Sequence, residues 1–257
     1  SCDHGRYRGQ YLRATLMGMG AMVETLETSR TWSRLGELHD ALLRIDGSRH
    51  ALLISAAGER AFSAGASVHD HLPERVGEML SLFHRCFRLL RRMPLTTVAL
   101  VDGPALGGGC ELTIACDFVL ASDRASFGTP EIALGVFPPV ATLLLEAQIG
   151  SRKALELILA GEPVSADEAL RLGLVNAVFP HDEFAGECDL WLQRIFRHSR
   201  SSLAAARKAF RLANADDFER RLDAVERLYL DELVESPDAV EGIAAFIEKR
   251  APAWKHR

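Results

Sequence analysis

Two glutamates, each beside a turn, are the residues in this sequence that are best suited to acid–base chemistry. Glu111 follows Gly107-Gly108-Gly109 in the first turn of a predicted helix, and Glu131 follows Thr129-Pro130, a pattern typical of a helix start with threonine as its N-cap. Taken alone, each carboxylate is explained by its favourable interaction with a helix dipole. If both lie in one pocket, their pKa values separate, and the pair can act as general base and general acid.

Two turns of small residues can supply backbone N–H groups to the same pocket. Phe62 to Ala66 lies between an apolar strand and a helix, and Gly107 to Gly109 opens a helix after a strand. N–H groups at a helix start lack partners and favour negative charge. A plain tight turn also explains the first segment. The glycines match neither Gly-x-Gly-x-x-Gly nor a P-loop, which disfavours a dinucleotide site.

Other reactive side chains carry weaker signals. His69 and His71 flank Asp70, but a third clustered ligand is missing, so we expect no metal site. Ser63 and Cys110 lack a nearby histidine signature, and packing of small residues explains both better than nucleophilic catalysis.

Length, charge and cysteine usage exclude several classes of protein. The chain has 257 residues, 48% of them hydrophobic, and a net charge of −5, which argues against disorder and against nucleic acid as a partner. No apolar run approaches the ~20 residues that span a bilayer, so we expect no membrane association. The five cysteines form no Cys-x-x-Cys pair and the first ten residues resemble no signal peptide, which predicts a cytoplasmic protein with free thiols.

The elements that must position these residues alternate between strand and helix. Hydrophobic periodicity predicts strands over 10–17, 51–56, 96–101 and 117–121, and helices over 31–46, 72–90 and 107–116. From about residue 141 the pattern is helical, with one apolar interruption at 175–179. We therefore predict an α/β core followed by α-helices. One helical face there carries Leu222, Val225, Tyr229 and Leu233, and it is either domain core or subunit interface.

Several motifs together resemble the enoyl-CoA hydratase/isomerase (crotonase) superfamily over residues 50–257. They are Phe62 to Ala66, Asp102 to Leu112, Cys116-Asp117 and Phe127 to Gly135, with further matches at 160–169, 173–176 and 246–250. The resemblance implies a spiral of ββα units over residues 1–195 and an α-helical trimerisation region over 196–257. It also implies a homo-oligomer, either a trimer or a dimer of trimers.

The resemblance also implies the substrate and the roles of the site residues. The substrate is an acyl-CoA thioester, so no separate cofactor is expected. The N–H groups of Ala66 and Gly108 form an oxyanion hole. Glu111 removes a proton from the attacking water, and Glu131 supplies one to carbon 2, as in hydratases. The implied substrate contacts are Ala64, His69, Leu72, Phe137, Pro138, Trp254 and Lys255.

Four departures from the family pattern bear on the substrate. Met17 to Ala21 replaces the usual Arg-Pro of the first strand, Ser67 replaces an aspartate, and His69 replaces a lysine. The usual glycine-rich loop is instead Val136 to Val140, with Phe137 and two prolines, which resembles the cyclohexa-1,5-diene-1-carbonyl-CoA hydratase branch. Two alternatives stay open: an enoyl-CoA isomerase on the same fold, and a non-catalytic CoA-binding protein.

Overall fold

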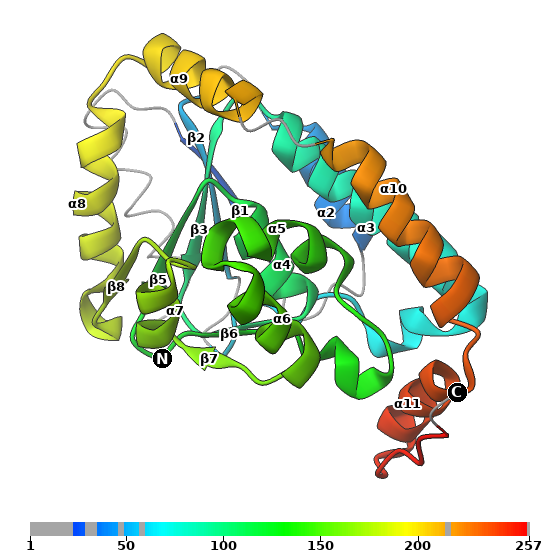
Figure 1. The fold of residues 1–257 in the computed structure, drawn as a ribbon. Helices are drawn as coiled ribbons and strands as arrows, with labels where there is room; N and C mark the ends of the chain where they lie inside the picture. The colour runs from blue at the N-terminus through cyan, green and yellow to red at the C-terminus, as the bar shows by residue number, and fades with distance from the viewer. Residues whose placement is uncertain (1–22, 29–34, 46–48, 57–59, 214–216, 256–257) are drawn as a thin grey trace.

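A five-stranded parallel sheet is the framework of the fold (Figure 1). The computed structural model describes residues 23–28, 35–45, 49–56, 60–213 and 217–255. The strands lie in the order β1 (Val23–Thr28), β2 (Ala51–Ala56), β3 (Thr96–Val101), β5 (Phe118–Ser122) and β8 (Ala177–Phe179). Parallel neighbours require crossover connections, and helices α2 (Leu35–Leu43) and α3 (Pro73–Arg92) lie in the first two of them.

The central strands are buried on both faces. Leu52 and Ile54 of β2 belong to the main hydrophobic core, whereas Ala51 and Leu53 pack in a second core under α8 (Phe184–Phe196). Successive side chains of a strand point to opposite faces, so a strand covered on both sides reads as a continuous apolar run. This burial confirms the strands predicted over 51–56 and 96–101.

A smaller sheet of short strands brings the two glutamate-bearing helices together. β4 (Pro104–Leu106) pairs in parallel with β6 (Ser126–Gly128), and β6 pairs with β7 (Val164–Ser165). β4 leads into α4 (Gly108–Ala115), and β6 leads into the 3₁₀ helix η2 (Pro130–Leu134). Because Leu106 and Gly128 are register partners, the two helices begin side by side.

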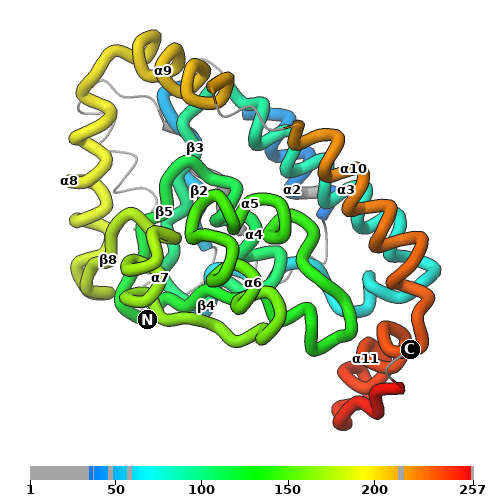
Figure 2. Tube along the Cα trace, in the orientation of Figure 1, coloured from blue at the N-terminus to red at the C-terminus, as the bar shows by residue number. Residues whose placement is uncertain are grey.

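The remaining helices run from the core to the rim of the molecule (Figure 2). α5 (Pro139–Ile149), α6 (Ser151–Ala160) and α7 (Ala166–Leu172) are followed, after β8, by the 3₁₀ helix η3 (His181–Glu183) and α8. The chain continues through α9 (Arg200–Ala213), α10 (Phe218–Leu228), the π-helical turn η4 (Tyr229–Leu233) and α11 (Pro237–Glu248). Among the described residues, no helix combines the length and apolar character needed to cross a bilayer.

Two kinds of contact dock the C-terminal helices on the core. Asp117, between α4 and β5, accepts hydrogen bonds from Arg207 Nε at 2.6 Å and Arg211 Nη2 at 2.8 Å, which fixes α9. On the face predicted as core or interface, Leu222 and Tyr229 are 0% and 1% exposed within this one chain. The inner part of that face is therefore domain core.

The predicted α/β class with C-terminal helices is confirmed. The predicted strand over 10–17 and the departure at 17–21 lie outside the described residues. Strand β1 and the short strands β4, β6 and β7 were not predicted. The domain boundary at residue 196 and the trimerisation region stay predictions.

Candidate active site

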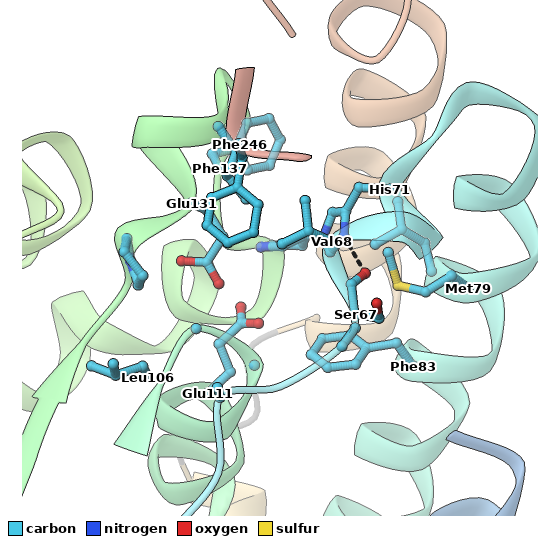
Figure 3. Close-up of a pocket in the computed structure, with 18 of the residues that line it drawn as sticks. Ser67, Val68, His71, Met79, Phe83, Leu106, Glu111, Glu131, Phe137 and Phe246 are labelled. Carbon is cyan, nitrogen blue, oxygen red and sulfur yellow. Dashed lines mark hydrogen bonds between the residues drawn. The ribbon is translucent and has the colours of Figure 1, made fainter. Parts of the chain in front are cut away.

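One cavity of about 460 Å³ lies where α4 and η2 begin, and its wall is mostly apolar. α3, the loop before α5, η4 and α11 complete its wall. Glu111 and Glu131 point their carboxyl groups toward one another across it, with Phe137 and Phe246 beyond Glu131 (Figure 3). The two carboxylates that the sequence singled out therefore meet in one place.

Glu111 is held by the first turn of α5. Its side chain is buried, and its Oε1 accepts hydrogen bonds from the backbone N–H groups of Val140 at 2.7 Å and Ala141 at 2.9 Å. Pro139 occupies the first helical position, where a missing N–H costs little, and the next N–H groups have no partner within the helix. Burial raises the pKa of Glu111, and the two hydrogen bonds oppose that rise.

Glu131 has a less polar environment. Its Oε2 is buried and has no hydrogen-bond partner among the described residues. Burial raises the pKa of Glu131, and the negative charge of Glu111 raises it further. Two N–H groups of α5 stabilise the charged form of Glu111. The charged form of Glu131 is stabilised only by the backbone N–H of Glu131 itself. At neutral pH this difference favours an ionised Glu111 beside a protonated Glu131.

The helix start before Glu131 differs from its prediction in one detail. Thr129 does stand at the N-cap position of η2, but its side chain makes no capping hydrogen bond. Its hydroxyl group donates instead to the Leu157 carbonyl oxygen at 3.3 Å. Thr129 therefore ties η2 to α6, on which Leu157 lies.

The two turns of small residues touch one another. Gly65 has a φ of +76°, and a Cβ atom there would lie 2.6 Å from the backbone nitrogen of Gly108. A Cβ atom on Gly109 would lie 2.2 Å from the Ser63 carbonyl oxygen. Only glycine permits this approach. Ala66 and Gly108 consequently line the same cavity, and the Gly108 N–H, at the start of α4, lacks an intrahelical partner.

Two histidines of the 3₁₀ helix η1 (Val68–His71) also line the cavity. His71 Nδ1 lies 3.0 Å from the Ser67 carbonyl oxygen, which can only accept, so Nδ1 carries a hydrogen (Figure 3). Burial lowers the pKa of His71, which favours the neutral ring. Within the described ranges, no group of three or more His, Cys, Asp or Glu side chains is arranged to hold a metal ion.

Seven of the eleven predicted site residues line this cavity: Ala64, Ala66, His69, Gly108, Glu111, Glu131 and Phe137. Four do not. Leu72 precedes α3, and its carbonyl oxygen accepts the N–H groups of the first turn. Pro138 precedes α5, and its neighbour Pro139 lines the cavity in its place. The roles of all eleven residues stay predictions.

Trp254 and Lys255 lie against α11, outside the cavity lining. The Trp254 ring contacts Gly242, where a Cβ atom would meet it at 2.9 Å. The Lys255 backbone N–H donates to Asp238 Oδ1 at 2.6 Å. These contacts place both residues on one side of α11.

Sequence reasoning missed the cavity residues of α3, η4 and α11. Phe83 and Tyr229 lie on helical stripes whose apolar period predicts burial, and the period does not distinguish a core from a cavity wall. Phe246 is 58% exposed and borders the cavity from α11. For Tyr229, the one available signal is a polar hydroxyl group on an otherwise apolar face.

The comparisons with known proteins agree with this geometry. The profile of the family described as Enoyl-CoA hydratase/isomerase matches residues 31–257. The chain belongs to this family. It is 39% identical over 207 residues to the cyclohexa-1,5-dienecarbonyl-CoA hydratase of Thauera aromatica, covering 80% of each chain. Membership of the enoyl-CoA hydratase/isomerase family confirms the predicted class of enzyme, a hydro-lyase of the enoyl-CoA hydratase type.

Solved structures of hydratases share the fold. An enoyl-CoA hydratase from Mycobacterium avium subsp. paratuberculosis has 32% identity and a TM-score of 0.74, covering 88% of this chain and 94% of that one. A carnitinyl-CoA hydratase from Mycobacterium avium has 32% identity and a TM-score of 0.77, covering 91% and 95%. The names of these relatives differ in the acyl group, so the family fold by itself does not define that group.

Proposed function

We propose that this enoyl-CoA hydratase family member adds water to the conjugated double bond of an α,β-unsaturated acyl-CoA thioester. The observation that carries the proposal is the facing pair of Glu111 and Glu131, whose environments favour one ionised and one protonated carboxyl group. Such a pair supplies a base and an acid at the same time. We further propose that the protein works as a cytoplasmic homo-oligomer without a separate cofactor.

We propose the following roles for the groups around the cavity. Glu111 takes a proton from water as the water oxygen bonds to carbon 3 of the acyl group. The electron pair of the double bond moves toward the thioester oxygen, and Glu131 gives its proton to carbon 2. The N–H groups of Ala66 and Gly108 stabilise the developing oxyanion, and one such donor typically contributes a factor of about 10² to 10³ in rate.

For the acyl group, we propose a flat cyclic diene of the cyclohexa-1,5-diene-1-carbonyl type. The relative from Thauera aromatica is named for that substrate. Phe137 and Tyr229 meet edge to face in the wall, with ring centroids 5.2 Å apart and planes at 71°. A rigid aromatic wall suits a planar ring better than a flexible chain. Pro138 and Pro139, directly after Phe137, limit the freedom of its backbone.

The test offers the protein crotonyl-CoA and cyclohexa-1,5-diene-1-carbonyl-CoA, and mass spectrometry detects the gain of one water. Higher kcat/KM for the diene supports the cyclic substrate, and higher kcat/KM for crotonyl-CoA refutes it. A shifted double bond without added water would identify an isomerase, and binding without conversion a CoA-binding protein. Glu111→Gln and Glu131→Gln should each abolish water addition, whereas Glu162→Gln, on an exposed residue, should not.

A further inference from the structure

Among the polar side chains that line the cavity, Tyr229 has no role in the mechanism above. We propose that the Tyr229 hydroxyl group donates a hydrogen bond to the oxygen atom that hydration adds to the acyl group. The role in turnover rests on the proposed function. Recognition of a hydroxyl group on the acyl chain can be tested without turnover.

Tyr229 is presented to the cavity by an unusual piece of backbone. It begins the π-helical turn η4, in which the Val234 N–H donates to the Tyr229 carbonyl oxygen at 3.0 Å, five residues back. π-helical turns are rare and occur frequently at functional sites. Tyr229 is 1% exposed, and it nevertheless lines the cavity. Its ring is thus fixed in the protein while one side of it borders the substrate space.

Tyr229 lines the same cavity as both carboxylates, and its hydroxyl group keeps its proton there. Burial raises the pKa of Tyr229, and the charges of Glu131 and Glu111, which line the same cavity, raise it further, so the phenol stays protonated. The Phe137 ring, at a centroid distance of 5.2 Å, fixes the orientation of the phenol ring.

The added oxygen needs a donor that neither glutamate supplies. Glu111 accepts the proton that water loses, and Glu131 delivers its proton to carbon 2. The water oxygen uses one lone pair to form the bond to carbon 3, and its second lone pair is free to accept a hydrogen bond. Tyr229 can donate to that lone pair without losing its own proton. The same hydrogen bond then persists in the hydroxyacyl product.

Tyr229→Phe tests this role, because it removes the hydroxyl oxygen and keeps the ring against Phe137. We expect kcat to fall about ten-fold, the value of one hydrogen bond. KM should change less than about two-fold, because the unsaturated substrate lacks the added oxygen. Leu228→Met, on the exposed neighbouring residue, is the matched control and should keep both constants. An unchanged kcat in Tyr229→Phe with an active wild type would overturn the inference and leave the hydratase function intact.

A second measurement separates this inference from the proposed function. In a Glu111→Gln background, which prevents turnover, calorimetry compares the binding of 3-hydroxybutyryl-CoA with that of butyryl-CoA. Adding Tyr229→Phe should weaken binding of 3-hydroxybutyryl-CoA about ten-fold and leave binding of butyryl-CoA unchanged. Equal effects on both ligands would refute the assignment. Tyr229→Phe could weaken binding of the hydroxylated ligand alone while the wild type adds water to no thioester. That result would refute the proposed function and leave the Tyr229 assignment standing.

Discussion

Replacing Glu131 with glutamine removes an ionisable group from the cavity with little change in shape, and we expect a more stable protein at neutral pH. Burial and the charge of Glu111 raise the pKa of Glu131 above its ordinary value of 4.5. A carboxyl group with a raised folded-state pKa contributes its full stability below the unfolded pKa and loses it as the pH rises. Holding the proton up to pH 7 costs about 1.4 kcal/mol for each of about 2.5 pH units, or ~3 kcal/mol.

Urea titrations at pH 5 and pH 7 measure this cost as a free energy of unfolding. Glu131→Gln should exceed the wild type in free energy of unfolding by ~3 kcal/mol at pH 7 and by only ~1 kcal/mol at pH 5, because pH 5 lies only about 0.5 pH units above the unfolded-state pKa of 4.5. Glu162→Gln is the control for loss of a carboxylate, because Glu162 is exposed, and its stability should follow the wild type at both values.

Two results would refute the reasoning. A Glu131→Gln variant no more stable than the wild type at pH 7 would mean that the folded protein does not retain the Glu131 proton, and Glu131 could not be the acid. A gain of equal size at both pH values would mean that packing of the amide, and not loss of a titrating group, stabilises the variant.

Three further perturbations test other parts of the site and fold. Glu111→Gln should lower kcat at least about 100-fold and, by removing a negative charge, lower the pKa of Glu131, which carbon-13 NMR of labelled glutamate carboxyls would follow. Gly107→Ala would place a Cβ atom 2.8 Å from Glu131 Oε1 at a φ of +53°, so kcat should fall about ten-fold or more in steady-state assays. Asp117→Asn should cost about 3 kcal/mol in thermal unfolding because the α9 arginines lose their counter-charge. The arginines and hydrogen bonds hold the pKa of Asp117 below its ordinary value of 3.8, so this cost should be full above pH 3.8 and decline as the pH falls from 3.8 through the lower folded-state pKa.

Each of these has a contrary outcome. An unshifted Glu131 pKa in Glu111→Gln would mean that the two carboxyl groups do not interact. Wild-type kcat in Gly107→Ala would mean that Glu131 can move away from the glycine turn without loss. An Asp117→Asn cost that persists at low pH would come from altered hydrogen bonding and not from charge.

Strong local signals explain what could be predicted from the sequence. The apolar runs 51–56 and 96–101 are buried on both faces, and such short apolar runs predict buried strands. The stripe from Leu72 to Leu90 repeats with a helical period, which predicts α3. Pairing of β4 with β6 is a long-range effect between strands of three residues, too short for a periodic pattern. The helix-start motifs raised the convergence of Glu111 and Glu131 only as a condition, and the family resemblance implied their joint roles; the structure places both in one cavity.

The missed parts of the site depend on tertiary contacts. The sequence pattern that buries Tyr229 also buries Leu222, and only the docking of α10 and η4 shows that Tyr229 borders a cavity. Likewise, Thr129 has the right type and position for a cap, yet the nearby Leu157 carbonyl oxygen takes its hydroxyl hydrogen. Competition between local and distant partners cannot be read from one sequence.

The wall residues Tyr229 and Phe246 follow Glu131 by about 100 residues in the chain. During synthesis at about 5–20 residues per second, the ribosome completes both glutamate-bearing helices several seconds before it releases the segment that closes the cavity. Throughout that interval the residues around the two carboxylates lack the wall that Tyr229 and Phe246 supply. A chain that ends before Tyr229 therefore lacks two parts of the cavity wall, although it contains both glutamates.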